Sequence, residues 1–126
     1  MSIVSKTSFQ SLVVLGGKWG GRLTSALLLV FWGSLFVEHT AEWFLRPDGQ
    51  YPPLLVWFQQ TAHFAMLVGL SLMLKWERLG GLILVIATVT FFGSIGMHHF
   101  PFLALINLVP IALFCASWLA AKRAAA

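Results

Sequence analysis

Four long apolar stretches, separated by short polar connections, constrain this chain more than any other feature. They span about residues 21–44, 53–74, 79–97 and 102–121. The hydrocarbon core of a bilayer is about 30 Å thick, and a helix needs about 20 apolar residues to cross it. An open strand in lipid would leave its backbone groups unpaired, so each stretch is predicted to be a helix. The sequence therefore predicts an all-α integral membrane protein with four transmembrane helices.

The connections between these stretches are too short to hold a separate soluble domain. Turn-forming residues mark them, such as Pro47 and Gly49 after the first stretch and Pro101 before the last. Because short connections make consecutive helices antiparallel neighbours, residues 1–126 are predicted to form one four-helix bundle with up-down-up-down topology. The segment 3–17 is too short and too polar to span. It favours either an interfacial helix on the membrane surface or a disordered tail.

Positive charges are distributed unequally between the two ends of the predicted helices. One end carries seven Lys and Arg residues, which are Lys6, Lys18, Arg22, Lys75, Arg78, Lys122 and Arg123. The other end carries Arg46 alone. Cytoplasmic segments of membrane proteins carry the excess of Lys and Arg. Both termini are therefore predicted to lie in the cytoplasm, with the chain in the cytoplasmic (inner) membrane of a bacterium.

The net charge of +4 does not indicate a nucleic-acid-binding protein. Such a protein needs a basic face on a folded soluble module. Here the positive charges flank apolar spans, where they anchor a protein against anionic lipid. The expected partners are the lipid bilayer and either other membrane subunits or further copies of this chain, and no nucleic acid is expected.

Polar side chains inside a membrane are costly, and each one is a hypothesis about function. His63 lies near the midpoint of the second predicted helix, and Gln59 and Gln60 precede it by four and three residues, which places them on its face. The rise of a helix puts Glu38 and Asn107 at comparable depths in the first and fourth helices. We therefore predict a binding pocket that opens toward the outer side and is lined by Glu38, Gln59, Gln60, His63 and Asn107.

Several interpretations of these polar groups stay open. Gln, Asn and His inside bundles often serve only to hydrogen-bond neighbouring helices. Imidazole and carboxylate groups also suit divalent metals. The candidate metal ligands near the outer end are Glu38, His39, Glu42, His98 and His99. Glu38 and Glu42 share one helix face, and His39 is expected to turn away from it. His63 could instead be an axial ligand of a haem or chlorin, because small residues neighbour it on its helix.

The sequence has no G-x-S-x-G elbow, P-loop or H-E-x-x-H motif. With its minimal loops, it favours a small non-enzymatic protein that acts as an accessory subunit or binding module of a larger membrane complex. One alternative is a redox or pigment protein that holds a macrocycle or metal through His63. Another is a small proton-coupled transporter or channel with a path through His63 and Glu38, although the apolar inner half argues against a continuous path.

A charged turn lies between the second and third predicted helices, with the sequence Lys75-Trp76-Glu77-Arg78-Leu79-Gly80-Gly81. Together with Trp57-x5-His63, it resembles a group of small uncharacterised bacterial four-helix membrane proteins that share a K-W-E-x-x-G-G turn. The resemblance covers mainly the second and third helices, and it implies the topology but no activity. Gly21-Arg22 is similar to the opening of the first helix in DoxX-like membrane proteins, but Glu38-His39 departs from the pattern that ends that helix.

Overall fold

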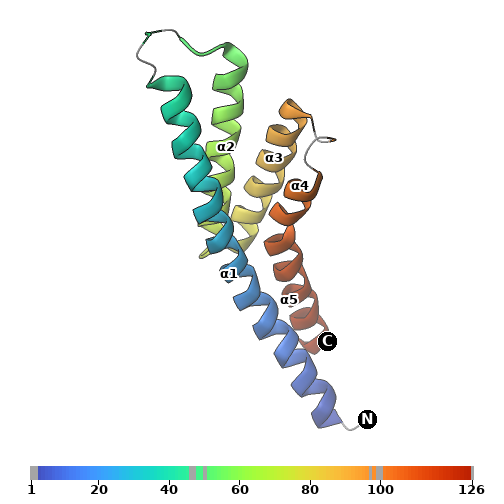
Figure 1. Ribbon diagram of the computed structural model, residues 1–126. Coiled ribbons are helices and arrows are strands. Elements are labelled where there is room, and N and C mark those ends of the chain that lie inside the picture. Colours follow the sequence, from blue (N-terminus) through green and yellow to red (C-terminus); the bar gives the residue numbers. More distant parts are fainter. Residues whose placement is uncertain (1–2, 46–47, 50, 97, 99–100, 126) are drawn as a thin grey trace.

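The protein is described by a computed structural model that covers residues 3–45, 48–49, 51–96, 98 and 101–125, with side chains from residue 8 onward. The regular structure of this part is entirely helical, as predicted. The helices are α1 (Ile3–Phe44), α2 (Leu54–Met73), α3 (Glu77–Ile95), α4 (Pro101–Asn107) and α5 (Val109–Ala125). The first three run alternately up and down, α4 and α5 both run opposite to α3, and both termini lie at the same end (Figure 1). We call this the terminal end, and the opposite end, where α1 leads into α2, the loop end.

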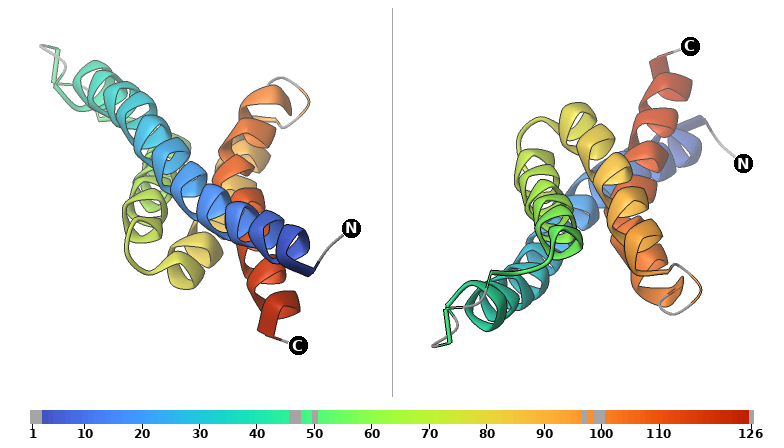
Figure 2. Two further views of the ribbon diagram at one scale, coloured as in Figure 1. Left: turned by 90° about the horizontal axis from the view of Figure 1, so that it is seen from below. Right: turned by 90° about the horizontal axis from the view of Figure 1, so that it is seen from above.

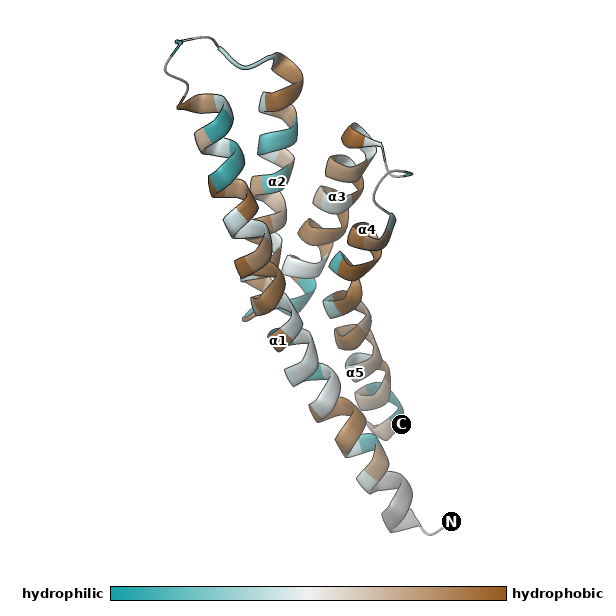
Figure 3. Ribbon diagram, in the orientation of Figure 1, coloured by the Kyte–Doolittle hydropathy of each residue, from teal (hydrophilic) through white to brown (hydrophobic). Residues whose placement is uncertain are grey.

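Four helical segments are long and apolar enough to cross a membrane, which confirms that part of the prediction. They are Ser8–Phe44, Leu54–Met73, Glu77–Ile95 and Pro101–Ala125, where the last combines α4 and α5. Residues along the middle of the spans are mostly hydrophobic, and hydrophilic residues gather near the loop end of α1 and α2 (Figure 3). Large apolar side chains such as Val30 and Phe64 point outward and are more than half exposed, as lipid-facing residues would be.

Helix α1 is longer than one membrane crossing requires. Its 42 residues extend for about 63 Å at ~1.5 Å per residue. The predicted interfacial segment 3–17 and the predicted span 21–44 are thus parts of one continuous helix. The Ser117 hydroxyl of α5 donates a hydrogen bond of 2.8 Å to the Val14 carbonyl. The segment therefore packs along α5, while its location at the membrane surface stays a prediction.

The last span is interrupted at Leu108, between α4 and α5. Pro110 lies just beyond this point. Proline has no backbone N–H, so it cannot donate the hydrogen bond that a continuous helix needs at its position. Around the break, the Leu108 amide instead bonds to the Leu105 carbonyl three residues earlier, at 3.0 Å. The interruption directly follows Asn107, whose side chain is buried in the core.

Backbones approach closely between α2 and α3 and between α1 and α5. Seen along the bundle, α1 crosses the span formed by α4 and α5 (Figure 2). A Cβ atom built on Gly69 of α2 would lie 2.8 Å from the Leu84 backbone nitrogen of α3. One built on Gly17 of α1 would lie 2.7 Å from the Leu113 carbonyl oxygen of α5. Small residues are typical of membrane helix interfaces because they allow this approach.

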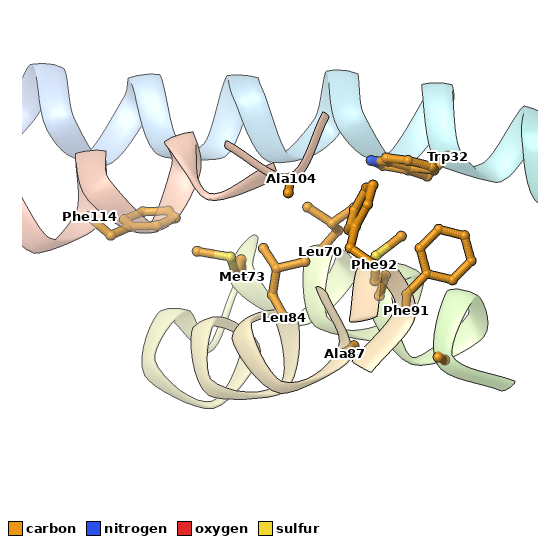
Figure 4. Packing of buried hydrophobic residues seen from close by; sticks show 11 residues of the cluster. Trp32, Leu70, Met73, Leu84, Ala87, Phe91, Phe92, Ala104 and Phe114 are labelled. Carbon is orange, nitrogen blue, oxygen red and sulfur yellow. The ribbon is translucent and has the colours of Figure 1, made fainter. Parts of the chain in front are cut away.

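The hydrophobic core fills the space between these pairs. Its members lie on all five helices: Trp32, Ala62, Met66, Leu70, Met73, Leu84, Ala87, Phe91, Phe92, Ala104 and Phe114. Trp32 lies flat beneath α1 over Phe92, while Met73, Leu84 and Phe114 lie further toward the terminal end (Figure 4). Met73, Leu84 and Phe114 are completely buried, so the core is closed on that side.

We expect Gly69→Ala to destabilise the protein and Gly93→Ala to leave it unchanged or slightly more stable. The added methyl at Gly69 meets the α3 backbone, and overpacking of this kind costs about 1–3 kcal/mol. Gly93 has no atom within 4 Å of the built Cβ, and helical alanine is intrinsically better than glycine by up to about 1 kcal/mol. Thermal unfolding of both variants in the same detergent measures the difference, and equal unfolding temperatures would refute the close approach.

Candidate functional site

A cavity of about 370 Å³ opens between the helices at the loop end. Each helical span contributes to its wall. The lining residues are Trp32, Leu35, His39, Trp43, Val56, Gln59, Gln60, His63, Phe91, Phe92, Ile95 and Leu103. Most of these side chains are aromatic or aliphatic, and the polar ones come from α1 and α2. A concave apolar site with a few polar groups is the usual form of a small-molecule site.

His63 of α2 lies at the deep end of this cavity and is 1 % exposed. Its Nε2 lies 2.9 Å from the Trp32 carbonyl oxygen of α1. Because a carbonyl can only accept a hydrogen bond, Nε2 must carry the proton and donate it. The other ring nitrogen, Nδ1, is buried and has no hydrogen-bond partner in the described part of the chain. The bond joins α1 to α2 at the point where the cavity meets the closed core.

Aromatic rings surround the His63 imidazole. The centroid of its ring lies 5.5 Å from that of Trp32, 5.3 Å from that of Phe36 and 5.2 Å from that of Phe91. Trp32 and Phe36 meet it edge to face, an arrangement that aromatic pairs prefer. Phe91 and Trp32 lie close together in Figure 4, with Phe91 on the side away from Phe114. The three rings pack around the imidazole, and Trp32 and Phe91 also line the cavity.

The polar side chains nearer the mouth of the cavity differ in their hydrogen-bond partners and in their exposure. Gln60 donates a 2.7 Å hydrogen bond to the Thr40 hydroxyl and a 3.3 Å bond to the Phe36 carbonyl, and it thereby ties α2 to α1. Gln59 is partly buried, and its amide has no partner among the residues that the structure describes. His39 is exposed, and its ring centroid lies 6.3 Å from that of His63. Gln59 and His39 are therefore available to an occupant of the cavity.

The structure brings three of the five predicted pocket residues, Gln59, Gln60 and His63, to one cavity. Glu38 is exposed and does not line it. The rotation of α1 differs from expectation, because His39, which was predicted to turn away, lines the cavity instead. Trp43 and the Phe91-Phe92 pair also line it, and only their apolar character marks them in the sequence.

Asn107 is fully buried on the terminal side of the cavity and does not line it. Its amide nitrogen donates a 2.7 Å hydrogen bond to the Thr88 hydroxyl of α3 and lies 3.4 Å from the Met66 sulfur of α2. This geometry joins three helices and fits the interpretation of Asn107 as an interhelical hydrogen-bonding residue. Its Oδ1 has no partner within the described residues.

The candidate metal ligands do not form a site in the part of the chain that the structure covers. Among the described residues, no three His, Cys, Asp or Glu side chains come together to hold a metal ion. This applies to Glu38, His39, Glu42 and His98, whereas His99 lies outside the described residues. For a haem or chlorin, ligation through Nε2 of His63 would require breaking its bond to the Trp32 carbonyl.

The cavity is closed on its terminal side. On the terminal side of His63, Met66, Leu70 and Leu84 are 0 % exposed and fill the space between the helices. The cavity thus ends at the core, and no polar route continues from it through these residues. Its described lining includes two imidazoles and two amides but no Ser, Cys, Asp or Glu side chain that could act as a nucleophile or carboxylate base.

Comparison with known proteins assigns a family to the chain. Residues 6–126 match the model of a family described as Domain of unknown function (DUF7670). Searches of curated proteins and of solved structures find no match. The family match includes every helix that contributes to the cavity. The chain therefore belongs to the family described as Domain of unknown function (DUF7670).

Proposed function

We propose that this chain is a binding module of the bacterial cytoplasmic membrane, with both termini in the cytoplasm and the loop end facing outward. The charge asymmetry supports this orientation, because Lys75, Arg78, Lys122 and Arg123 gather toward the terminal end while the loop end has Arg46 alone. Both termini lie at the same end of the molecule, as an even number of spans requires (Figure 1). Association with other membrane subunits stays a prediction.

The orientation is testable with a membrane-impermeant maleimide on intact cells. In a Cys115→Ser background, we expect Tyr51→Cys to be labelled from outside and Lys75→Cys to be labelled only after the membrane is opened. Tyr51 lies between α1 and α2 and is 92 % exposed, and Lys75 lies between α2 and α3 and is also exposed. Labelling of Lys75→Cys, but not Tyr51→Cys, in intact cells would show the opposite orientation.

The ligand that this cavity fits best is a neutral, ring-bearing lipophile with at least one hydrogen-bonding oxygen. The observation that carries the proposal is the aromatic wall of Trp32, Trp43, Phe91 and Phe92 around a cavity of about 370 Å³. Flat rings stack well against such walls. The lining is mostly aromatic and aliphatic, which suits a lipophilic molecule that partitions into the bilayer.

The absence of charge in the cavity supports a neutral ligand. Its described lining residues include no Lys, Arg, Asp or Glu, so a charged ligand would find no opposite charge there. An unpaired charge within a membrane is costly. Gln59 and His39 offer both donor and acceptor groups nearer the mouth, whereas the rings of Trp32 and Phe92 lie deeper. We therefore expect the ligand's ring to lie against Trp32 and its oxygen to lie near Gln59 or His39.

A naphthoquinone with a short alkyl chain is a suitable probe, because it is neutral, flat and bears carbonyl oxygens. We expect it to quench the tryptophan fluorescence of the purified protein saturably, since Trp32 and Trp43 line the cavity. Ile95→Phe fills part of the cavity and should weaken binding by about fivefold or more, because overpacking costs about 1–3 kcal/mol. Binding is measured by titration in a nonionic detergent.

The matched control is Ile106→Phe, which makes the same change at a residue that is 49 % exposed and outside the cavity. It should bind the naphthoquinone as the unmodified protein does. An alkyl alcohol of the same chain length, which lacks a ring, should not compete. Quenching that fails to saturate, or that both Phe variants weaken equally, would rule out the cavity as a binding site.

A further inference from the structure

A second hollow lies at the terminal end, on the opposite side of the core from the cavity. Its volume is about 680 Å³, and it is open. The residues that line it are Lys18, Arg22, Lys75, Trp76, Glu77, Arg78, Leu79 and Trp118. It therefore combines four cationic side chains with a single carboxylate. The other acidic residues of the chain, Glu38, Glu42 and Asp48, belong to the loop end of α1 and the connection that follows it.

The single carboxylate, that of Glu77, already has two partners within the protein. Glu77 accepts a 3.0 Å hydrogen bond from the Trp118 indole N–H of α5. Arg22 of α1 lies 3.9 Å from its other oxygen, a long ion pair. These contacts join α1, α3 and α5 at one level. Glu77 therefore balances at most one of the four positive charges, and the hollow keeps an excess of positive charge.

Several hydrogen-bond donors in the hollow are available to a ligand. The Nε of Arg22 is buried and has no partner among the described residues. Helix α3 begins at Glu77 without a side-chain cap, and the residues of this positive helix end, Glu77, Arg78 and Leu79, line the hollow. Lys75 lies 5.0 Å above the Trp76 ring and has no carboxylate partner in the described part of the chain.

We infer that this hollow binds the phosphate group of an anionic membrane lipid. Arginine and lysine side chains with an uncapped helix end are the groups that recognise phosphate. The level of the site also fits a lipid headgroup, because Trp76 and Trp118 line it and tryptophan favours the boundary between hydrocarbon and water. Exposed apolar residues continue from it along the membrane-facing surface, including Leu79 and Leu82 of α3, where acyl chains would lie. The site is specific, unlike the general attraction between basic ends and lipid.

The test uses the full chain in nonionic detergent, with phosphatidylglycerol or phosphatidylcholine added and bound lipid counted by native mass spectrometry. We expect selective retention of phosphatidylglycerol. Lys75→Gln combined with Arg78→Gln should weaken its binding by roughly 25-fold, from about fivefold for each cation removed. Both residues are exposed, and the change leaves the contacts of Glu77 with Arg22 and Trp118 in place, although it removes the Arg78 guanidinium from above the Trp118 ring.

The matched control combines Lys122→Gln with Arg123→Gln, which removes two charges from the end of α5 outside the hollow. It should retain phosphatidylglycerol with unchanged affinity. The proposal would be overturned if both double variants lost affinity for phosphatidylglycerol equally, or if the protein retained phosphatidylcholine as well as phosphatidylglycerol. Competition with inorganic phosphate and glycerol phosphate shows whether the phosphate group that binds belongs to a lipid or to a soluble compound. Neither should displace the lipid, and displacement by either at the concentration at which the lipid binds would assign the hollow to a soluble phosphate compound instead.

Discussion

The rest of the bundle depends on the hydrogen bond that His63 donates to the Trp32 carbonyl. It joins α1 to α2 at 2.9 Å, and the surrounding rings of Trp32, Phe36 and Phe91 hold the imidazole in place. On one side of it the helices are closely packed, and on the other they enclose a cavity of about 370 Å³. A polar group buried at this depth is tolerated because its proton has a partner.

The two ends of the molecule differ because different side chains occupy the space between the same helices. Toward the terminal end, Gly17 and Gly69 let backbones approach, and the large side chains of Met73 and Phe114 fill what remains. Toward the loop end, side-chain hydrogen bonds such as that of Gln60 to Thr40 hold α1 and α2 together instead. Glycine contacts therefore give a closed core, and the wider spacing at the loop end leaves room for a ligand.

Much of the fold was predictable from the sequence, and helix rotation was not. The four spans follow from uninterrupted apolar length, and the break at Leu108 follows from Pro110. In a soluble helix, the polar face shows which side is buried. A lipid-facing side is as apolar as the core, so this signal is weak here, and the sequence misplaced both Glu38 and His39 relative to the cavity. The same limitation hid the packing of Asn107 against Thr88, which depends on how α4 turns relative to α3.

The proton of the His63 imidazole tests this account most directly. Nitrogen NMR of protein labelled at histidine, in lipid bilayers, distinguishes which ring nitrogen carries hydrogen and whether that hydrogen exchanges with water. With His63→Gln as the reference that assigns the signal, the account predicts a proton on Nε2 that exchanges slowly, because it is buried and bound to the Trp32 carbonyl. A proton on Nδ1 alone, or rapid exchange at Nε2, would show that α1 and α2 are not joined at this position.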